Sequence, residues 1–191
     1  MLHSVSMVPF AILWLGWLAY WFVAARDVKA TRRHEPRLTR LLHVALIVIA
    51  AVLLAFRLDA LAWLDERFLP STVIAYWLGL VMLAAGIAVA VWARRYLGRN
   101  WSGTVTVKQD HELVRSGPYR FVRHPIYTGL LLAILGTAVA IGEWRGLIAF
   151  ALITAGFLLK IRTEERFMSE TFADAYARYR AEVPALIPFI V

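Results

Sequence analysis

Apolar residues dominate five stretches of the chain, and polar residues gather between them. A helix that crosses a bilayer needs roughly 20 mostly apolar residues, because a rise of about 1.5 Å per residue must cover a hydrocarbon core of about 30 Å. The stretches Met7–Ala25, Leu41–Phe56 and Ser71–Ala93 meet or approach this length and contain only His43 as an ionisable residue. The first half of the chain therefore predicts three membrane-spanning helices.

Two further apolar stretches, Pro125–Gly142 and Gly146–Leu159, are separated by three residues, which predicts a tight helical hairpin. The second has 14 residues and would be about 21 Å long as a helix, too short to cross alone. Its helix must continue and carry Lys160, Arg162 and Glu164 into the membrane interface. The pattern as a whole predicts an all-α integral membrane protein with five transmembrane helices.

The longest segment without a helical pattern covers residues 94–124, where Gly and Pro residues interrupt the chain and residues 104–107 alternate like a short strand. A loop of this length is usually functional or disordered, and its aromatic content favours an ordered loop that packs. After the hairpin, aromatic and apolar residues recur with helical spacing and predict a tail helix that ends at Val183-Pro184 and closes over the loop. These residues are Met168, Phe172, Tyr176 and Tyr179.

Lys and Arg residues are unevenly divided between the two sides of this expected bundle. Residues 26–40 carry six, residues 94–123 carry seven and the tail from Lys160 carries five, whereas residues 57–67 and Arg145 carry three together. Cytoplasmic connections are enriched in these cations. We therefore expect a protein of a bacterial inner or plasma membrane, with the N-terminus outside and with the loop, the tail and the active site on the cytoplasmic side. No cation precedes the first span, so we expect it to be retained rather than cleaved.

The composition of the chain excludes several kinds of catalytic and metal-binding site. The chain is 61% hydrophobic and 18% charged, with no cysteine and a net charge of +8. Without cysteine, disulfides, thiolate metal sites and cysteine nucleophiles are excluded, and the five His residues share no metal-ligand spacing, so we expect no metal. The cations lie between apolar stretches, which favours membrane lipids over nucleic acid as partners. We expect one domain, with a three-helix part at 1–93 and a cofactor-binding catalytic part at 94–191.

One dense string of motifs lies in the second half. Residues 113–129 read LVRSGPYRFVRHPIYTG, Arg162-Thr-Glu-Glu165 follows, and Tyr176 and Tyr179 precede Pro184. In this order and spacing the chain resembles the isoprenylcysteine carboxyl methyltransferases and their prokaryotic relatives. The resemblance covers about residues 92–191, a little over half of the chain.

The resemblance implies that S-adenosylmethionine binds between loop, hairpin and tail, leaves as S-adenosylhomocysteine, and methylates the carboxylate of a lipidic or prenylated substrate that enters from the bilayer. In this family a cation near the substrate, usually Arg, lies four residues before the cofactor-binding Glu, which implies a catalytic role for Lys160. Lys lacks the planar bidentate fork of Arg, so either the geometry differs or Arg162 helps. A further substrate-side cation corresponds to Arg94 or Arg95. The implied cofactor contacts are Lys108, His111, Glu112, Leu113, Val114, Tyr119, His124, Pro125, Ile126, Tyr127 and Glu164.

The residues suit this chemistry. A carboxylate is already ionised near neutral pH, so its methylation needs no general base but needs aligned reactants. Glu164 or an aromatic face suits a cationic cofactor, and Lys160 suits an anionic acceptor. We interpret Glu165 as a structural ion-pair residue, Arg120 and Arg123 as possible anchors at the membrane surface, and the tryptophans as packing residues.

Three other functions stay open at this point. Phospholipid N-methyltransferases and NADPH-dependent sterol reductases resemble the same C-terminal half, although an amine acceptor needs an acidic patch and a reductase needs a larger pocket. A small transporter or lipid-binding membrane protein is the non-enzymatic alternative. Transporters usually place ionisable groups at mid-bilayer, and here such groups gather at one side. The sequence does not indicate an oligomeric state.

Overall fold

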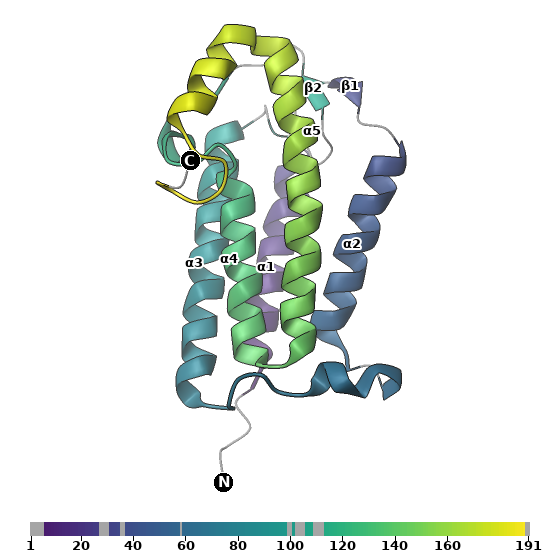
Figure 1. The fold of residues 1–191 in the computed structure, drawn as a ribbon. Helices are drawn as coiled ribbons and strands as arrows, with labels where there is room; N and C mark the ends of the chain where they lie inside the picture. Colours follow the sequence, from purple (N-terminus) through teal and green to yellow (C-terminus); the bar gives the residue numbers. More distant parts are fainter. Residues whose placement is uncertain are drawn as a thin grey trace.

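The computed structural model of the 191-residue chain describes residues 6–26, 31–34, 37–57, 59–98, 101, 106–108 and 113–189. Its main helices lie side by side along one long axis (Figure 1). They are α1 (Val8–Ala24), α2 (Arg37–Ala55), α3 (Val73–Leu97), α4 (Pro125–Ile141) and α5 (Trp144–Glu182). Each of the five apolar stretches is a helix, as the pattern predicts.

The described helices have the length and composition expected of a membrane bundle. By these two criteria α3 and α5 are long and apolar enough to cross a membrane, and α1, the apolar part of α2, and α4 are shorter apolar helices. Many large apolar side chains on α1, α2 and α3 are exposed outward, as in Leu15, Val48 and Ile74. The number of spans stays a prediction.

Glycines bring α3 and α4 unusually close together. A Cβ atom at Gly86 or Gly129 would clash with the carbonyl oxygen of the other, and Gly79 and Gly136 form the same kind of pair two turns away. Small residues at such positions let helix backbones approach in a membrane. This contact fixes the α4 N-terminus against the end of α3. The remaining helices pair differently, α1 with α3 and α2 with α5.

The two ends of the bundle differ in content (Figure 1). One end holds the short helix η1 (Asp59–Asp65) and the α4–α5 turn, where buried Glu143 pairs with Arg57 and Arg145, each at 2.6 Å. The other end holds the short helix η3 (Gly117–Arg120), a small sheet and the last part of α5. The helix α1 begins at the first of these ends, and the segment after α5 lies near the second (Figure 1).

Three local predictions are corrected by the structure. The expected loop 94–124 begins later, because α3 continues as a helix through Leu97 to Gly98, whose φ is 52°. The tail helix starts later than the spacing from Met168 indicated, because non-helical backbone at Ala173, with φ 40°, divides α5 into two helical segments, of which the second ends at Glu182. The helix does continue past Leu159, as its short apolar stretch required.

The third correction concerns two strands. The fold is helical except for β1 (Thr31–His34) and β2 (Thr106–Lys108), which pair antiparallel with Arg33 opposite Val107. The sequence suggested a short strand near 104–107 but gave no sign of its partner, because the pairing joins segments far apart in the chain. The sheet links the α1–α2 connection to the segment before η3.

Candidate functional site

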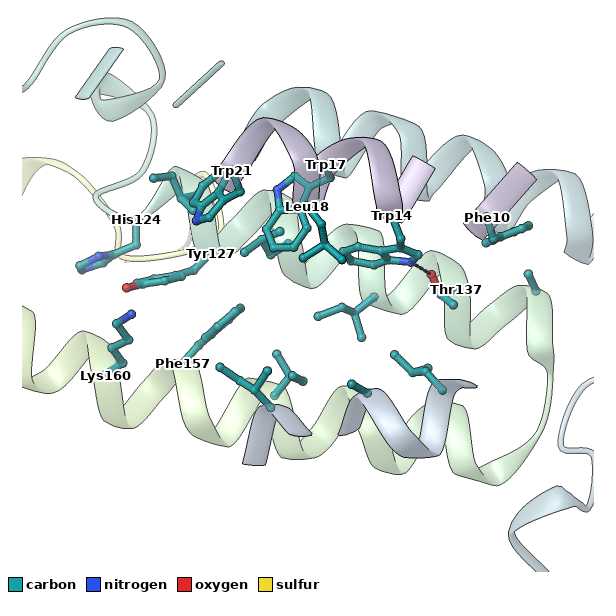
Figure 2. Close-up of a pocket in the computed structure, with 18 of the residues that line it drawn as sticks. Phe10, Trp14, Trp17, Leu18, Trp21, His124, Tyr127, Thr137, Phe157 and Lys160 are labelled. Carbon is teal, nitrogen blue, oxygen red and sulfur yellow. Dashed lines mark hydrogen bonds between the residues drawn. The ribbon is translucent and has the colours of Figure 1, made fainter. Parts of the chain in front are cut away.

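An elongated cavity of about 1290 Å³ lies among the five helices and extends beneath the last part of α5. Charged side chains line both ends of the cavity: His124, Lys160 and Glu164 at the end near the tail, and Arg57, Glu143 and Arg145 at the end near η1. Its middle is lined by apolar and aromatic side chains (Figure 2). Eight of the predicted site residues line it. They are Leu113, Val114, Tyr119, His124, Ile126, Tyr127, Lys160 and Glu164.

Glu164 joins the α4 N-terminus to α5 inside this cavity. The Tyr127 hydroxyl donates a hydrogen bond of 2.5 Å to Glu164 Oε1, and His124 Nδ1 lies 3.4 Å from Glu164 Oε2. The Lys160 ammonium lies 5.7 Å from the centre of the Tyr127 ring, within range of a cation–π interaction. An acid, an imidazole, a phenol and a cation therefore share one end of the cavity.

His124 also contacts the second carboxylate of the pair. Its Nε2 atom lies 3.3 Å from Glu165 Oε1, so the buried imidazole bridges Glu164 and Glu165. Burial lowers the pKa of His124, but the two neighbouring carboxylates outweigh burial, and the net pKa lies above the usual value. The protonated imidazole is the form that both carboxylates favour.

Glu165 has a different role from Glu164. Its Oε1 atom accepts a hydrogen bond of 2.8 Å from Arg123 Nε and lies 2.6 Å from Arg123 Nη2. Both side chains are nearly buried. Arg123 also donates to the carbonyl oxygens of Arg180 and Val183. Glu165 thus orients the Arg that holds the end of α5, which supports its structural interpretation.

The segment after α5 pairs with the α4 N-terminus through the backbone. Arg123 N donates to Pro184 O at 2.8 Å and His124 N donates to Ala185 O at 3.0 Å. The Thr128 hydroxyl donates to Leu186 O at 2.6 Å. These bonds satisfy amide groups at the start of α4 that the helix itself leaves unpaired, and they hold the tail over the cavity.

The tail also covers η3, as the sequence predicted. Tyr179 donates to the Tyr119 carbonyl oxygen at 2.6 Å, and Tyr176, Tyr179 and Val183 form a buried cluster with Leu113 against it. Burial raises the pKa of Tyr119, so its phenol stays protonated. Its hydroxyl donates to Ala93 O at 3.4 Å, and the residue lines the cavity.

Four predicted site residues do not line the cavity. Pro125 is fully buried as the first residue of α4, and Arg95 and Arg162 are exposed. Arg94 is buried, donates to Gly98 O at 2.7 Å and Ala24 O at 2.5 Å, and stacks on cavity-lining Trp101. Of the two candidates at the end of α3, Arg94 is thus the one next to the cavity wall.

Three predicted cofactor contacts lie in or next to segments that are not among the described residues. His111 and Glu112 fall outside the described residues, and Lys108 is described only as the last residue of β2. Their roles stay predictions.

Sequence reasoning missed the contribution of α1 to the cavity wall. Trp14, Trp17 and Trp21 all line it and form a row of ring contacts, 5.6 Å between the first two and 5.2 Å between the last two. Their spacing of three and four residues places them on one helix face, a signal that was present in the sequence. Met168 and Tyr176 on the last part of α5 also line the cavity.

The chain is similar to known families of membrane methyltransferases. The family model for phospholipid methyltransferases matches residues 74–175, more than half of the chain. A rice protein (Oryza sativa subsp. indica) named probable protein-S-isoprenylcysteine O-methyltransferase is 31% identical over 153 residues, which cover 76% of this chain and 80% of that protein. The chain belongs to the isoprenylcysteine O-methyltransferase family.

Two further matches agree with this membership. The protein-S-isoprenylcysteine O-methyltransferase of Schizosaccharomyces pombe is 38% identical over 96 residues, which cover 49% of this methyltransferase and only 41% of the yeast protein. The solved structure of the eukaryotic intramembrane Ras methyltransferase, isoprenylcysteine carboxyl methyltransferase, matches with a TM-score of 0.52 at 20% identity, covering 98% of this chain and 70% of that one. The second likeness shows that the arrangement of helices is shared.

Proposed function

We propose that this methyltransferase transfers a methyl group from S-adenosylmethionine to the carboxylate of an isoprenylcysteine-like lipid. The observation that carries the proposal is the continuity of the cavity: the group of Glu164, His124, Tyr127 and Lys160 lies at one end of a long apolar space. Sites for one small ligand usually enclose about 300–1,000 Å³. A cavity of about 1290 Å³ has room for a cofactor and a lipid chain together.

The residues at the polar end fit a cationic nucleoside cofactor. Glu164 supplies a carboxylate, Tyr119 and Tyr127 supply aromatic faces, and both kinds of group attract a sulfonium. S-adenosylmethionine, when bound, supplies an electrophilic methyl group. Leu113 and Val114, which line the cavity beside Tyr119, give an apolar wall suited to one face of an adenine ring.

Lys160 is placed to hold the acceptor. Its ammonium faces Tyr127 inside the cavity (Figure 2), and an ammonium attracts a carboxylate strongly where water is excluded. The ionised carboxylate of the acceptor attacks the methyl group directly, so the reaction needs no general base. The role of Lys160 is therefore to position this carboxylate. Phe157, whose ring lies 4.7 Å from that of Tyr127, begins the apolar wall that the lipid chain would follow.

This proposal includes the orientation in the membrane. The end of the bundle with the sheet, η3 and the tail carries most cations and would lie in the cytoplasm, with the N-terminus outside. The start of α1 and the segment after α5 lie near opposite ends of the bundle (Figure 1), which supports an odd number of crossings. The catalytic half from residue 94 depends on α2 packing against α5, so we expect the whole chain to be needed.

Phospholipid methylation is the second candidate, because the matching family model carries that name. An amine acceptor would be repelled by the Lys160 ammonium, whereas a carboxylate would be attracted. The family membership favours methyl transfer over the reductase and transporter hypotheses.

The test uses the full chain purified in detergent or lipid nanodiscs. Methyl transfer to an S-farnesylated N-acetylcysteine is measured together with the binding of S-adenosylhomocysteine by calorimetry. Loss of a charge-assisted hydrogen bond costs about 1.5–3 kcal/mol, so Lys160→Ala should lower kcat/KM for the acceptor by about 10- to 100-fold, with cofactor binding nearly unchanged. Glu164→Gln should instead weaken binding of S-adenosylmethionine, measured in the same way without acceptor, because the sulfonium loses the carboxylate that attracts it.

The matched control is Arg166→Ala, which removes a cation from the same helix where the side chain is 74% exposed. It should change neither quantity. Transfer to phosphatidylethanolamine but not to the prenylcysteine would favour the second candidate. Absence of any cofactor binding by the wild-type protein would refute both.

A further inference from the structure

The segment after α5 carries two large apolar side chains that are exposed. Ile187 is 57% exposed and Phe189 is 92% exposed. The chain just before them is fixed, because the carbonyl oxygens of residues 184–186 accept hydrogen bonds from the start of α4. The two side chains therefore have a definite place beside the first turn of that helix.

This place corresponds to the surface of a membrane. The apolar helix α4 starts at Pro125, so in a bilayer its first turn lies where hydrocarbon meets water. Figure 1 shows the segment after α5, in yellow, near the upper ends of α3 and α4 and on the side of the bundle away from α2. The exposed side chains thus lie at the flank of the bundle and at the depth of the lipid headgroups.

Other exposed aromatic residues lie at the same end of the bundle. Trp92 and Tyr96 on α3 meet edge to face at 6.0 Å and are 43% and 48% exposed. A Cβ atom at Gly117 would meet the Tyr96 ring, so η3 lies against this pair, and Phe121 just after η3 is 40% exposed. Aromatic side chains are enriched where a membrane meets water. These residues continue the exposed apolar face of α3 towards the start of α4.

The charges on this surface fit lipid headgroups better than a second copy of the chain. The Arg120 guanidinium lies 4.4 Å from the centre of the Phe121 ring, and both Arg95 and Arg120 are exposed. A symmetric contact between two copies uses the same surface twice, which would bring these cations together. Anionic headgroups attract them instead.

We propose that Ile187 and Phe189 form an interfacial anchor, which inserts into the bilayer surface beside α3 and α4 and holds the tail over the polar end of the cavity. The location of the anchor does not depend on the proposed function, because it needs only the bilayer. Its link to the cavity is short. The same segment is hydrogen-bonded to the backbone of His124, whose side chain lines the polar end.

The experiment locates the segment with a nitroxide label. The chain has no cysteine, so Ile187→Cys creates one labelling site and leaves Phe189 in place. In nanodiscs of phosphatidylethanolamine and phosphatidylglycerol, oxygen, which concentrates in the bilayer, should relax the label more than a water-soluble nickel chelate does. Val81→Cys, at a position 63% exposed in the middle of α3, is the lipid-facing control. Arg178→Cys, exposed on the last part of α5, is the water-facing control.

A second arm tests whether the anchor holds the tail. Adding Phe189→Ser to Ile187→Cys should make the label more accessible to the nickel chelate. Phe189→Ser alone should weaken binding of S-adenosylhomocysteine in the same nanodiscs about fivefold, because part of the burial of one aromatic side chain is lost. Ile74→Ser is the matched control, since it removes a side chain that is 80% exposed at the other end of α3 and should leave this binding unchanged.

The outcomes separate this proposal from the proposed function. A label at residue 187 as accessible to nickel as the label at residue 178 would overturn the anchor. Spin–spin broadening between labels at residue 187 would show that a second copy covers the surface, and would overturn it too. Unchanged cofactor binding in Phe189→Ser, or an equal loss in Ile74→Ser, would remove its role in holding the tail. If the wild-type protein binds no S-adenosylhomocysteine, the proposed function fails, and the label still decides where the segment lies.

Discussion

Replacing Glu165 by Gln tests the division of labour between the two adjacent glutamates. The change keeps the size of the side chain and one acceptor oxygen but removes the charge that faces Arg123, and both side chains of this ion pair are about nine-tenths buried. Hydrogen bonds to charged groups contribute about 1.5–3 kcal/mol, against about 1 kcal/mol for neutral ones. The contact of Arg180, 3.7 Å away and 61% exposed, adds little because solvent screens it.

We therefore expect Glu165→Gln to lower the free energy of unfolding by about 2 kcal/mol, most of it from Arg123. For a chain of this size such a loss lowers Tm by about 4–8 °C. The assay is thermal unfolding in detergent, followed by the fluorescence of the tryptophans. Limited proteolysis should also show earlier cleavage after the break at Ala173, because Arg123 holds the segment beyond it.

The control is Glu170→Gln on the same helix, whose carboxylate pairs with Arg166 near the surface at 2.9 Å. Such i,i+4 pairs contribute about 0.3–0.5 kcal/mol, so the expected change in Tm is about 1–2 °C. A Glu165→Gln variant no less stable than Glu170→Gln, or one that loses cofactor binding at unchanged stability, would refute the structural role of Glu165.

Two further predictions concern packing and protonation. Gly86→Ala should destabilise the bundle by about 1–3 kcal/mol in unfolding assays, because the new Cβ meets the Gly129 carbonyl oxygen. The control Gly16→Ala, with open space around that position, should be neutral or slightly stabilising. Equal effects of the two changes would contradict the close approach of α3 and α4. Because the pKa of His124 is raised in the fold, its stabilisation is complete below its ordinary pKa of about 6.5 and is lost as pH rises through the raised value. Tm of the wild type should then fall over that range more than Tm of His124→Asn, and parallel pH profiles would remove His124 from the bridge.

The helices were the most predictable part of the fold. Long apolar stretches, a Pro at the start of α4 and a left-handed Gly142 at its end are local signals that the structure reproduces. The pairing of β1 with β2 was not predictable, because it depends on contacts between segments about 75 residues apart in the sequence. The start of the tail helix was misplaced because the break at Ala173 has no Gly or Pro to mark it.

The site was predicted where the motif itself meets the cavity. Motif residues at the start of α4 and Glu164 on α5 were identified correctly as neighbours, because a hairpin brings those positions together. The wall contributed by α1 was missed, since three tryptophans on an apolar helix are equally typical of a membrane interface. Only the packing of α1 against α3 distinguishes the two interpretations.

The adjacent residues Glu164 and Glu165 on α5 contact two different parts of the protein. Successive residues on an α-helix point about 100° apart, so Glu164 turns towards Tyr127 and the cavity while Glu165 turns towards Arg123 and the tail. His124 touches both carboxylates. Any change in the charge of Glu164, such as its pairing with a cationic ligand, alters the field at His124 and through it the bond that holds the tail. The same three residues therefore connect the polar end of the cavity to the Arg that holds the segment covering it.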